Sequence, residues 1–329
     1  MLSCDEGYML ATDEKNRDVT LYSHHSKLLS APIALTRRNF FKAASCMVTL
    51  VGVDFLSTNF LRGEFEVTTL LKGGNRMDME LKEKFITLWE RYFNGWELPI
   101  AFYYTDEQGC AEVVKPPSGH QCFIGVLSKV RRGMSLCFDE NSIGCGGGKR
   151  YLGFTEEIMP NFEYFLSCGI PGKLEGERYK KTPELVKELM KELPKFKAPA
   201  RFIVFKRWDR LEELDAPEVV IFFAQPDVLS GLFTLASFDE VEPDGVFAPF
   251  ASGCGSIVMY PYLEKDSSRP RGVLGMFDVS ARPYASKDTL TFAVPINKFV
   301  RMIENMEESF LVTSSWGKVR ARIKKQMKL

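Results

Sequence analysis

Two short glycine-cysteine-glycine turns are the segments of this chain that are best suited to chemistry. The first is 144–148, Gly-Cys-Gly-Gly-Gly, and the second is 253–255, Gly-Cys-Gly. A cysteine between glycines leaves its sulfur open to close approach, and the glycines permit backbone conformations closed to other residues. Such turns suit a ligand, metal or cluster site better than a packed core.

Metal binding by thiolates is the chemistry that these turns suggest first. Thiolates are soft ligands that suit iron–sulfur clusters, zinc and copper(I). The chain has no Cys-x-x-Cys pair and no ferredoxin-type spacing, so a metal site requires thiols that converge only in the folded protein. Its only histidines are His24, His25 and His120, which argues against a multi-histidine zinc site. His120, two residues before Cys122, could complete a set of three thiols.

The glycine-rich turn also permits an anion site. Gly146, Gly147 and Gly148, followed by Lys149 and Arg150, would present backbone N–H groups and two cations at a helix start. The pattern is neither a Walker A loop nor a dinucleotide fingerprint. Glycine and lysine at a helix start are also common where no ligand binds.

Ordinary roles compete for the cysteines. Cys110, Cys137 and Cys168 have unremarkable surroundings, and the position of Cys137 between Leu136 and Phe138 predicts a buried small side chain. In an exported protein the cysteines could instead form disulfides. A further alternative makes Cys145 a nucleophile whose pKa is lowered at a helix N-terminus.

The composition predicts a large folded core and argues against a nucleic-acid partner. The chain has 329 residues, 45% of them hydrophobic, and 43 Lys plus Arg balance 43 Asp plus Glu. Basic residues concentrate only near the end, where 311–329 is expected to be a basic tail whose helix docks through Val319, Ile323 and Met327.

Residues 1–75 are interpreted as a leader and linker. Thr-Arg-Arg-Asn-Phe-Phe-Lys at 36–42 and the weakly apolar stretch after it resemble a twin-arginine export signal, placed at 36–56. The alternative is a mature helix that carries two arginines by chance. An export signal would make the protein a partner of the twin-arginine machinery and place it in the cell envelope or periplasm, whereas its absence would favour the cytoplasm.

Hydrophobic periodicity and capping residues predict an α+β or α/β fold of mixed sheets with flanking helices. The expected helices are 78–94, 123–130, 183–193, 226–238 and 295–308, and the expected strands are 99–104, 134–138, 201–206, 218–223, 272–277 and 289–294. The order strand, helix, strand, Gly-Cys-Gly turn, helix occurs twice, which predicts two pseudo-repeated halves at about 96–155 and 200–300 within a domain at 76–310. After the expected strand at 272–277, Asp278, Arg282 and Tyr284 form a polar group. An interior ion pair between Asp278 and Arg282 is expected, and a role in holding a ligand is the alternative.

Five short segments resemble the ArCR family, a domain of unknown function numbered 169. They are 121–126 (Gln-Cys-Phe-Ile-Gly-Val), 145–148 (Cys-Gly-Gly-Gly), 152–154 (Leu-Gly-Phe), 253–254 (Gly-Cys) and 261–263 (Pro-Tyr-Leu), within a resemblance that covers about 80–305. The resemblance implies Cys122, Cys145 and Cys254 as the characteristic thiols, and it brings no established activity. Members show a further cysteine near 275–278, where this chain has Met276.

The sequence therefore predicts a thiol-ligated metal or iron–sulfur protein with redox or cofactor chemistry. Cys122, Cys145, Cys254 and His120 are the candidate metal ligands, and 146–150 is the candidate cofactor-binding segment. The alternatives are a non-catalytic exported protein that binds a small anion or cofactor, and a cysteine-nucleophile enzyme.

Overall fold

The structure, a computed structural model, describes residues 3–4, 8–12, 19–23 and 76–327. The chain divides into two compact units, Met1–Phe65 and Glu66–Leu329. The described part of the first unit is a three-stranded antiparallel sheet in the order β1 (Ser3–Cys4), β2 (Tyr8–Thr12), β3 (Val19–Ser23). The expected export signal at 36–56 lies outside the described residues. In the part of the chain that the structure describes, no helix is both long and apolar enough to span a membrane.

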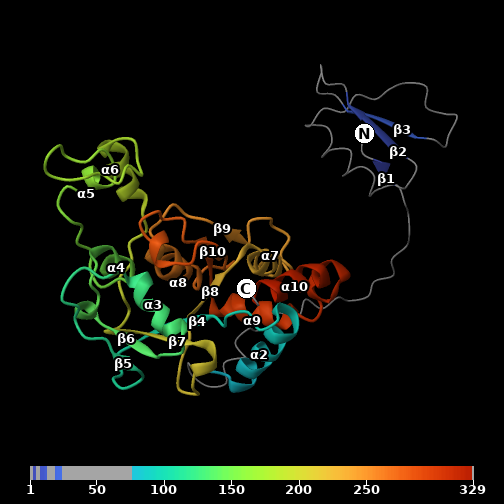
Figure 1. Cartoon of the computed structure of the whole chain (residues 1–329), viewed down its shortest axis with the longest axis horizontal. Coiled ribbons are helices and arrows are strands. Elements are labelled where there is room, and N and C mark those ends of the chain that lie inside the picture. Colours follow the sequence, from blue (N-terminus) through green and yellow to red (C-terminus); the bar gives the residue numbers. More distant parts are fainter. Residues whose placement is uncertain (1–2, 5–7, 13–18, 24–75, 328–329) are drawn as a thin grey trace. The chain divides into compact units, whose positions relative to one another are not determined.

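The second unit combines an eight-stranded sheet with flanking helices (Figure 1). Its strands are β4 (Ile100–Thr105), β5 (Glu112–Val113), β6 (Leu136–Phe138), β7 (Phe202–Arg207), β8 (Val219–Ala224), β9 (Val246–Phe247), β10 (Gly272–Gly275) and β11 (Leu290–Pro295). Its α-helices are α2 (Met79–Phe93), α3 (Phe123–Arg131), α4 (Gly146–Tyr151), α5 (Phe162–Phe165), α6 (Pro183–Glu192), α7 (Pro226–Ala236), α8 (Tyr260–Glu264), α9 (Ile296–Asn305) and α10 (Ser314–Gln326). Short helical turns are η2 (Glu140–Ser142), η3 (Trp208–Arg210), η5 (Arg282–Tyr284) and η6 (Phe310–Val312), and η4 (Gly255–Met259) is a π-helix that leads into α8. This mixed sheet confirms the predicted fold class.

The sheet consists of two halves with the same topology. Its order is β5-β6-β7-β4-β8-β11-β10-β9, so that β4-β7-β6-β5 and β8-β11-β10-β9 extend outward from the central β4–β8 pair. In each half the outermost pair is parallel and the other pairs are antiparallel. The halves defined by pairing are 100–207 and 219–295, because β7 belongs with β4, β5 and β6. The boundaries inferred from the sequence, 96–155 and 200–300, instead grouped β7 with the second half.

Each face of the sheet is covered by its own hydrophobic core. Alternate side chains of a strand point to opposite faces, so Val220 and Phe222 of β8 join the core formed with α2, α7, α9 and α10. Val219 and Ile221 join the second core, which contains side chains of α3 and η4. Figure 1 shows α3, α4 and α8 gathered on one side of the sheet, away from α2, α9 and α10. Of the candidate thiols, Cys254 belongs to the second core and Cys122 packs against it.

Capping residues begin and end the helices where the sequence predicts. The Asp78 carboxylate accepts the N–H groups of Glu80 and Leu81 at 2.9 and 3.1 Å, and α2 ends at Asn94 in the left-handed conformation. The Thr182 hydroxyl accepts the N–H of Leu185 at 3.3 Å, one residue before Pro183 begins α6. Local sequence chemistry thus determines these boundaries.

A small third cluster packs around Cys137 on the sheet face opposite the second core. Tyr103, Phe202 and Val204 surround it, and Cys137 itself is buried, which confirms its predicted role as a packed side chain. Burial, followed by the charges of Cys110 and Asp139, raises the pKa of Cys137 to about 11.

The C-terminal helix α10 is packed onto the domain. Trp316 and Ile323 are buried in the first core, and the Trp316 indole donates to the Tyr92 carbonyl at 2.8 Å. Val319 packs against the same core, whereas Met327 is exposed. The expected docking of this basic segment through an apolar face is therefore correct for Val319 and Ile323 and wrong for Met327.

Candidate functional site

Each of the three candidate thiols lies at the start of a helix. Cys122 is the N-cap of α3 and Cys145 is the N-cap of α4. Cys254 has helical φ and ψ of −63° and −40° immediately before the π-helix η4. π-Helical turns are frequent at functional sites. The sequence predicts a helix after Cys122 and Cys145, but the π-helix after Cys254 was not predicted.

Glycines allow the starts of α3 and α4 to pack closely. A Cβ at Gly148 would lie 2.9 Å from Cys145 Sγ and 3.5 Å from the Phe123 Cβ. A Cβ at Gly144 would lie 3.0 Å from the Gln121 nitrogen. Only glycine fits these two positions without displacement of its neighbours, so they hold the segments of Cys122 and Cys145 together.

The turn of Cys254 packs against the same two helices. A Cβ at Gly253 would lie 3.2 Å from Ile124 Cγ1 in α3, and one at Gly255 would lie 3.0 Å from the Tyr151 ring in α4. The three helix starts therefore meet in the second core, although their cysteines are far apart in the sequence.

The electrostatic environment of the thiols reflects this proximity. Burial raises the pKa of Cys254 well above its ordinary value, and negative charges at Cys145, Cys122 and Asp278 would raise it further. Burial is also the main cause of the raised pKa of Cys122, which the backbone N–H groups of Gly125 and Ile124 partly oppose. Cys145 and Asp278 contribute to that increase as well. Both thiols are therefore favoured in their protonated form.

Cys145 lies next to two exposed glycines. It is half-buried, and its Sγ accepts the N–H of Gly148 at 3.1 Å. Gly146 and Gly147 are exposed, and a Cβ at either position would have no neighbour within 4 Å. Neither glycine has a positive φ, so within this structure neither packing nor backbone conformation requires glycine there.

Asp278 fixes the segment after β10 against the turn of Cys254. Its carboxylate accepts the N–H of Gly253 at 3.1 Å, the hydroxyl of Ser280 at 2.8 Å and the hydroxyl of Tyr179 at 3.3 Å. The expected ion pair with Arg282 is wrong. The guanidinium of Arg282 donates instead to main-chain carbonyls of the following turn, at Ser286, Lys287 and Thr289.

Met276 is a residue of this site whose role the sequence did not reveal. The predicted strand 272–277 ends at Gly275, and Met276 adopts a left-handed conformation with φ of 66°. Its side chain is only 1% exposed, and its Sδ would lie 3.1 Å from a Cβ at Gly253. A methionine after a predicted strand does not indicate a left-handed backbone conformation. That conformation could be recognised only from the folded structure.

The remaining predicted residues are less closely associated with the thiols. His120 is exposed in the loop before α3, and Lys149 is half-buried. Arg150 donates to the Glu156 carbonyl at 2.6 Å. Among residues 76–327, every cysteine is a free thiol, and no group of three or more His, Cys, Asp or Glu side chains is arranged to hold a metal ion. The thiols are therefore neighbours without forming a closed ligand set.

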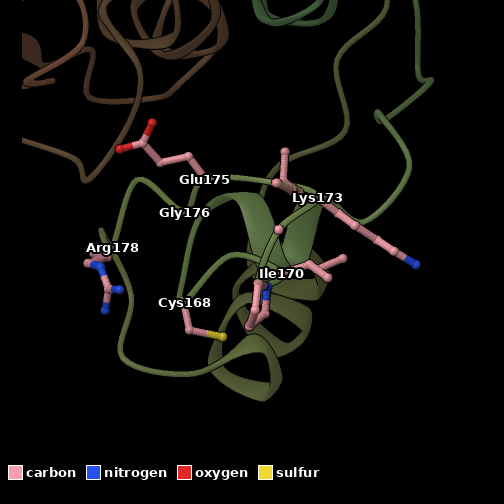
Figure 2. Close-up of a pocket in the computed structure, with 9 residues that line it drawn as sticks. Cys168, Ile170, Lys173, Glu175, Gly176 and Arg178 are labelled. Atoms are coloured by element: carbon pink, nitrogen blue, oxygen red, sulfur yellow. The ribbon is translucent and has the colours of Figure 1, made fainter.

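A separate surface pocket surrounds the exposed Cys168. It is lined by a loop that folds back on itself, with a bridge between Ile170 and Leu174. Figure 2 shows that Lys173 and Glu175 extend away from each other, so their charges do not converge on the Cys168 sulfur. This pocket is formed from one local segment and contains none of the three candidate thiols.

Comparisons with known proteins identify a family over most of the second unit. No curated protein and no solved structure matched the chain. One family model, described as uncharacterised ArCR, matches residues 96–305, which include Cys122, Cys145 and Cys254. This match confirms the resemblance inferred from the cysteine segments. The chain belongs to the ArCR family.

Proposed function

We propose that Cys122, Cys145 and Cys254 form a thiolate site for a metal ion or iron–sulfur cluster that serves redox or cofactor chemistry. The observation that carries the proposal is the meeting of three helix starts in one core. There, charges on Cys122 and Cys145 are close enough to raise the pKa of Cys254. Soft thiolate ligands suit zinc, copper(I) and iron–sulfur clusters.

The three candidate cysteines are free thiols and so are available for coordination. All six cysteines of residues 76–327 are unpaired, and the raised pKa values of Cys122 and Cys254 keep protons on both sulfurs. A metal ion must displace those protons, since thiolates and not thiols are the ligands. Metal uptake should therefore release protons and become stronger as pH rises.

Assembly of the site requires the thiol side chains to rotate toward a common point. Cysteine side chains have three staggered χ1 positions, so a thiol at a helix start can turn without movement of the helix. Cys145 would exchange its hydrogen bond from Gly148 for a metal bond. Gly146 and Gly147 leave the approach to Cys145 open, and Lys149 is the nearby cation in this segment that could offset thiolate charge.

A cysteine-nucleophile enzyme is the second candidate, and it is favoured by the surroundings of Cys145. Cys145 is half-buried next to two exposed glycines, and its Sγ accepts the N–H of Gly148. His120, the histidine nearest in the sequence, is exposed. An anion-binding protein has weaker support, because Arg150 is already engaged with the Glu156 carbonyl.

Export through the twin-arginine route remains part of the proposal. It rests on Arg37 and Arg38 within the motif at 36–42. This route carries folded proteins, so a cofactor could be inserted before export. Replacement of both arginines by lysine should retain the protein in the cytoplasm when cell fractions are compared. An unchanged distribution would contradict an export role for this motif.

The direct test is metal and acid-labile sulfide analysis of protein purified without oxygen, together with its visible spectrum. We expect stoichiometric metal in the wild type and its loss when Cys122, Cys145 and Cys254 are all replaced by alanine. The matched control replaces Cys110 and Cys168, which lie outside the second core, and should retain the metal.

Two results would contradict the metal proposal. One is metal-free wild-type protein that also fails to bind Zn(II), Cu(I) or reconstituted iron and sulfide. The other is equal metal content in the two sets of cysteine variants. Selective, stoichiometric alkylation of Cys145 in such metal-free protein would favour the nucleophile.

A further inference from the structure

Met276 occupies a strained position beside the turn that carries Cys254. A positive φ is uncommon for a residue other than glycine and is energetically unfavourable. Met276 nevertheless has φ of 66°, and its side chain is almost completely buried. Its Sδ lies over the Gly253 turn, in the same core as Cys254 and the partly buried Cys122. The strained backbone holds a soft sulfur atom against the Gly253 turn, which carries Cys254.

The repeated topology gives Met276 a counterpart in the other half of the sheet. The parallel pair β5–β6 is connected through α3, which begins at Cys122, and the parallel pair β9–β10 is connected through η4 and α8, which begin after Cys254. Cys122 and Cys254 thus occupy equivalent positions in the two halves. The order of elements in the sequence had instead matched the Cys254 turn with the Cys145 turn.

The same equivalence extends to the segment after each connection. Cys145 lies in the segment that follows β6, and Met276 lies in the segment that follows β10. Each half therefore supplies one sulfur at the start of its connecting helix and one after its second parallel strand. The two halves together place four sulfur atoms in the second core and its margin.

We propose that Met276 Sδ is the fourth donor of this site and that the site takes copper(I). This inference rests on the proposed thiolate site and specifies its metal. A neutral thioether is a soft ligand that suits copper(I), whereas zinc and iron–sulfur clusters are held mainly by thiolates, imidazoles and carboxylates. Each thiol that binds copper(I) transfers its proton to solvent, and Met276 binds without proton loss.

The test measures copper(I) affinity without oxygen, by competition with bicinchoninate, in wild-type and Met276→Leu protein. Leucine keeps a similar volume and removes the sulfur. We expect the copper(I) affinity to fall by at least about tenfold, the lower end of what loss of an outer-shell partner costs a metal site. X-ray absorption should show one sulfur neighbour fewer, and zinc affinity should change by less than about twofold.

Two further variants keep the result interpretable. Met302→Leu changes a buried methionine in the first core and should leave copper(I) affinity unchanged. Met276→Cys restores a sulfur donor, so it should retain copper(I) and strengthen zinc binding, even if the leucine variant folds poorly.

The outcomes separate this inference from the proposed function. Equal copper(I) affinity and equal sulfur coordination in wild-type and Met276→Leu protein would overturn the role of Met276 alone. Iron and sulfide in the wild type, with no specific copper(I) site, would support the thiolate site and overturn copper(I). Failure of the wild type to bind any of these metals would overturn both.

Discussion

The Gly253 N–H donates to Asp278 Oδ2 at 3.1 Å and so joins the turn of Cys254 to the segment that follows β10. The bond places a carboxylate beside two thiols whose pKa values it helps to raise, those of Cys122 and Cys254. Asp278 thus has a structural and an electrostatic effect on the same site.

Replacement of Asp278 by Asn should separate these effects. Asparagine keeps an oxygen that can accept the Gly253 N–H and removes the charge. Burial is the main cause of the raised pKa of Cys122, so we expect only part of the increase to disappear. Cys122 should then be alkylated faster at a given pH, because a larger fraction is thiolate. The measurement is the pH dependence of iodoacetamide labelling of Cys122, read by mass spectrometry.

Asp244→Asn is the matched control for this experiment. Asp244 pairs with Arg269 away from the candidate thiols, so its replacement should leave the labelling profile of Cys122 unchanged. A profile for Asp278→Asn that is unchanged, or shifted to higher pH, would rule out the electrostatic effect.

The glycines of α4 should respond to alanine in opposite ways. At Gly148 a Cβ would lie 2.9 Å from both Cys145 Sγ and Ile143 Cγ2, so Gly148→Ala should destabilise the domain by about 1–3 kcal/mol. At Gly147 the space is open, and Gly147→Ala should raise the free energy of unfolding by up to about 1 kcal/mol. Urea denaturation of the metal-free protein measures both.

The metal affinity of the Gly147→Ala variant provides a second measurement. If a metal or its ligand approaches the backbone of α4, Gly147→Ala should weaken metal binding while it stabilises the metal-free fold. Stabilisation with unchanged metal affinity would show that Gly147 has no role in access. Equal destabilisation by the two alanines would contradict the open space at Gly147.

The sequence predicted elements that depend on local chemistry. Asp78 and Thr182 begin their helices through side-chain hydrogen bonds, and the uninterrupted apolar run of β8 is buried on both faces. The predicted helix starts at Cys122 and Cys145 are also correct. Each of these features is determined by residues within a few positions of one another.

Features that depend on distant segments were not predicted. The equivalence of α3 with η4 and α8 follows from strand pairing across the sheet, which the order of elements alone did not reveal. Met276 adopts a left-handed conformation and its side chain packs against the Gly253 turn, which the sequence around it did not indicate. Arg282 donates to main-chain carbonyls instead of pairing with Asp278. The glycines beside the cysteines were enough to suggest that the thiols converge. The contacts between the helix starts could be identified only from the folded structure.

Cys137 should make stability depend on pH in the alkaline range. Burial, with smaller effects of Cys110 and Asp139, raises its pKa from 9.0 to about 11. Above pH 9.0 the unfolded chain loses this proton while the folded protein keeps it, so the stabilisation is complete below pH 9.0 and is lost as pH rises to about 11. The loss should be about 2–3 kcal/mol, since one pK unit corresponds to 1.36 kcal/mol.

The variant Cys137→Ala isolates this contribution. Other groups titrate equally in both proteins, so the difference in unfolding free energy between wild type and variant should shrink between pH 9.0 and about 11. Urea denaturation at several pH values gives that difference. A difference that stays constant across this range would show that Cys137 titrates alike in the folded and unfolded states.

Helix α10 should contribute strongly to the stability of the domain, although its sequence is that of a basic tail. The Trp316 ring lies 5.1 Å from the Phe93 ring in edge-to-face geometry, and its indole donates to Tyr92. A Cβ at Gly231 would lie 2.5 Å from the Trp316 ring, so α7 approaches this ring closely. Trp316→Ala should lower the free energy of unfolding by about 3–5 kcal/mol, whereas Lys318→Ala, on the exposed face, should change it by less than about 0.5 kcal/mol. Urea denaturation of both variants measures these free energies of unfolding. If Trp316→Ala were as stable as the wild type, α10 would be an appended segment with no part in the core.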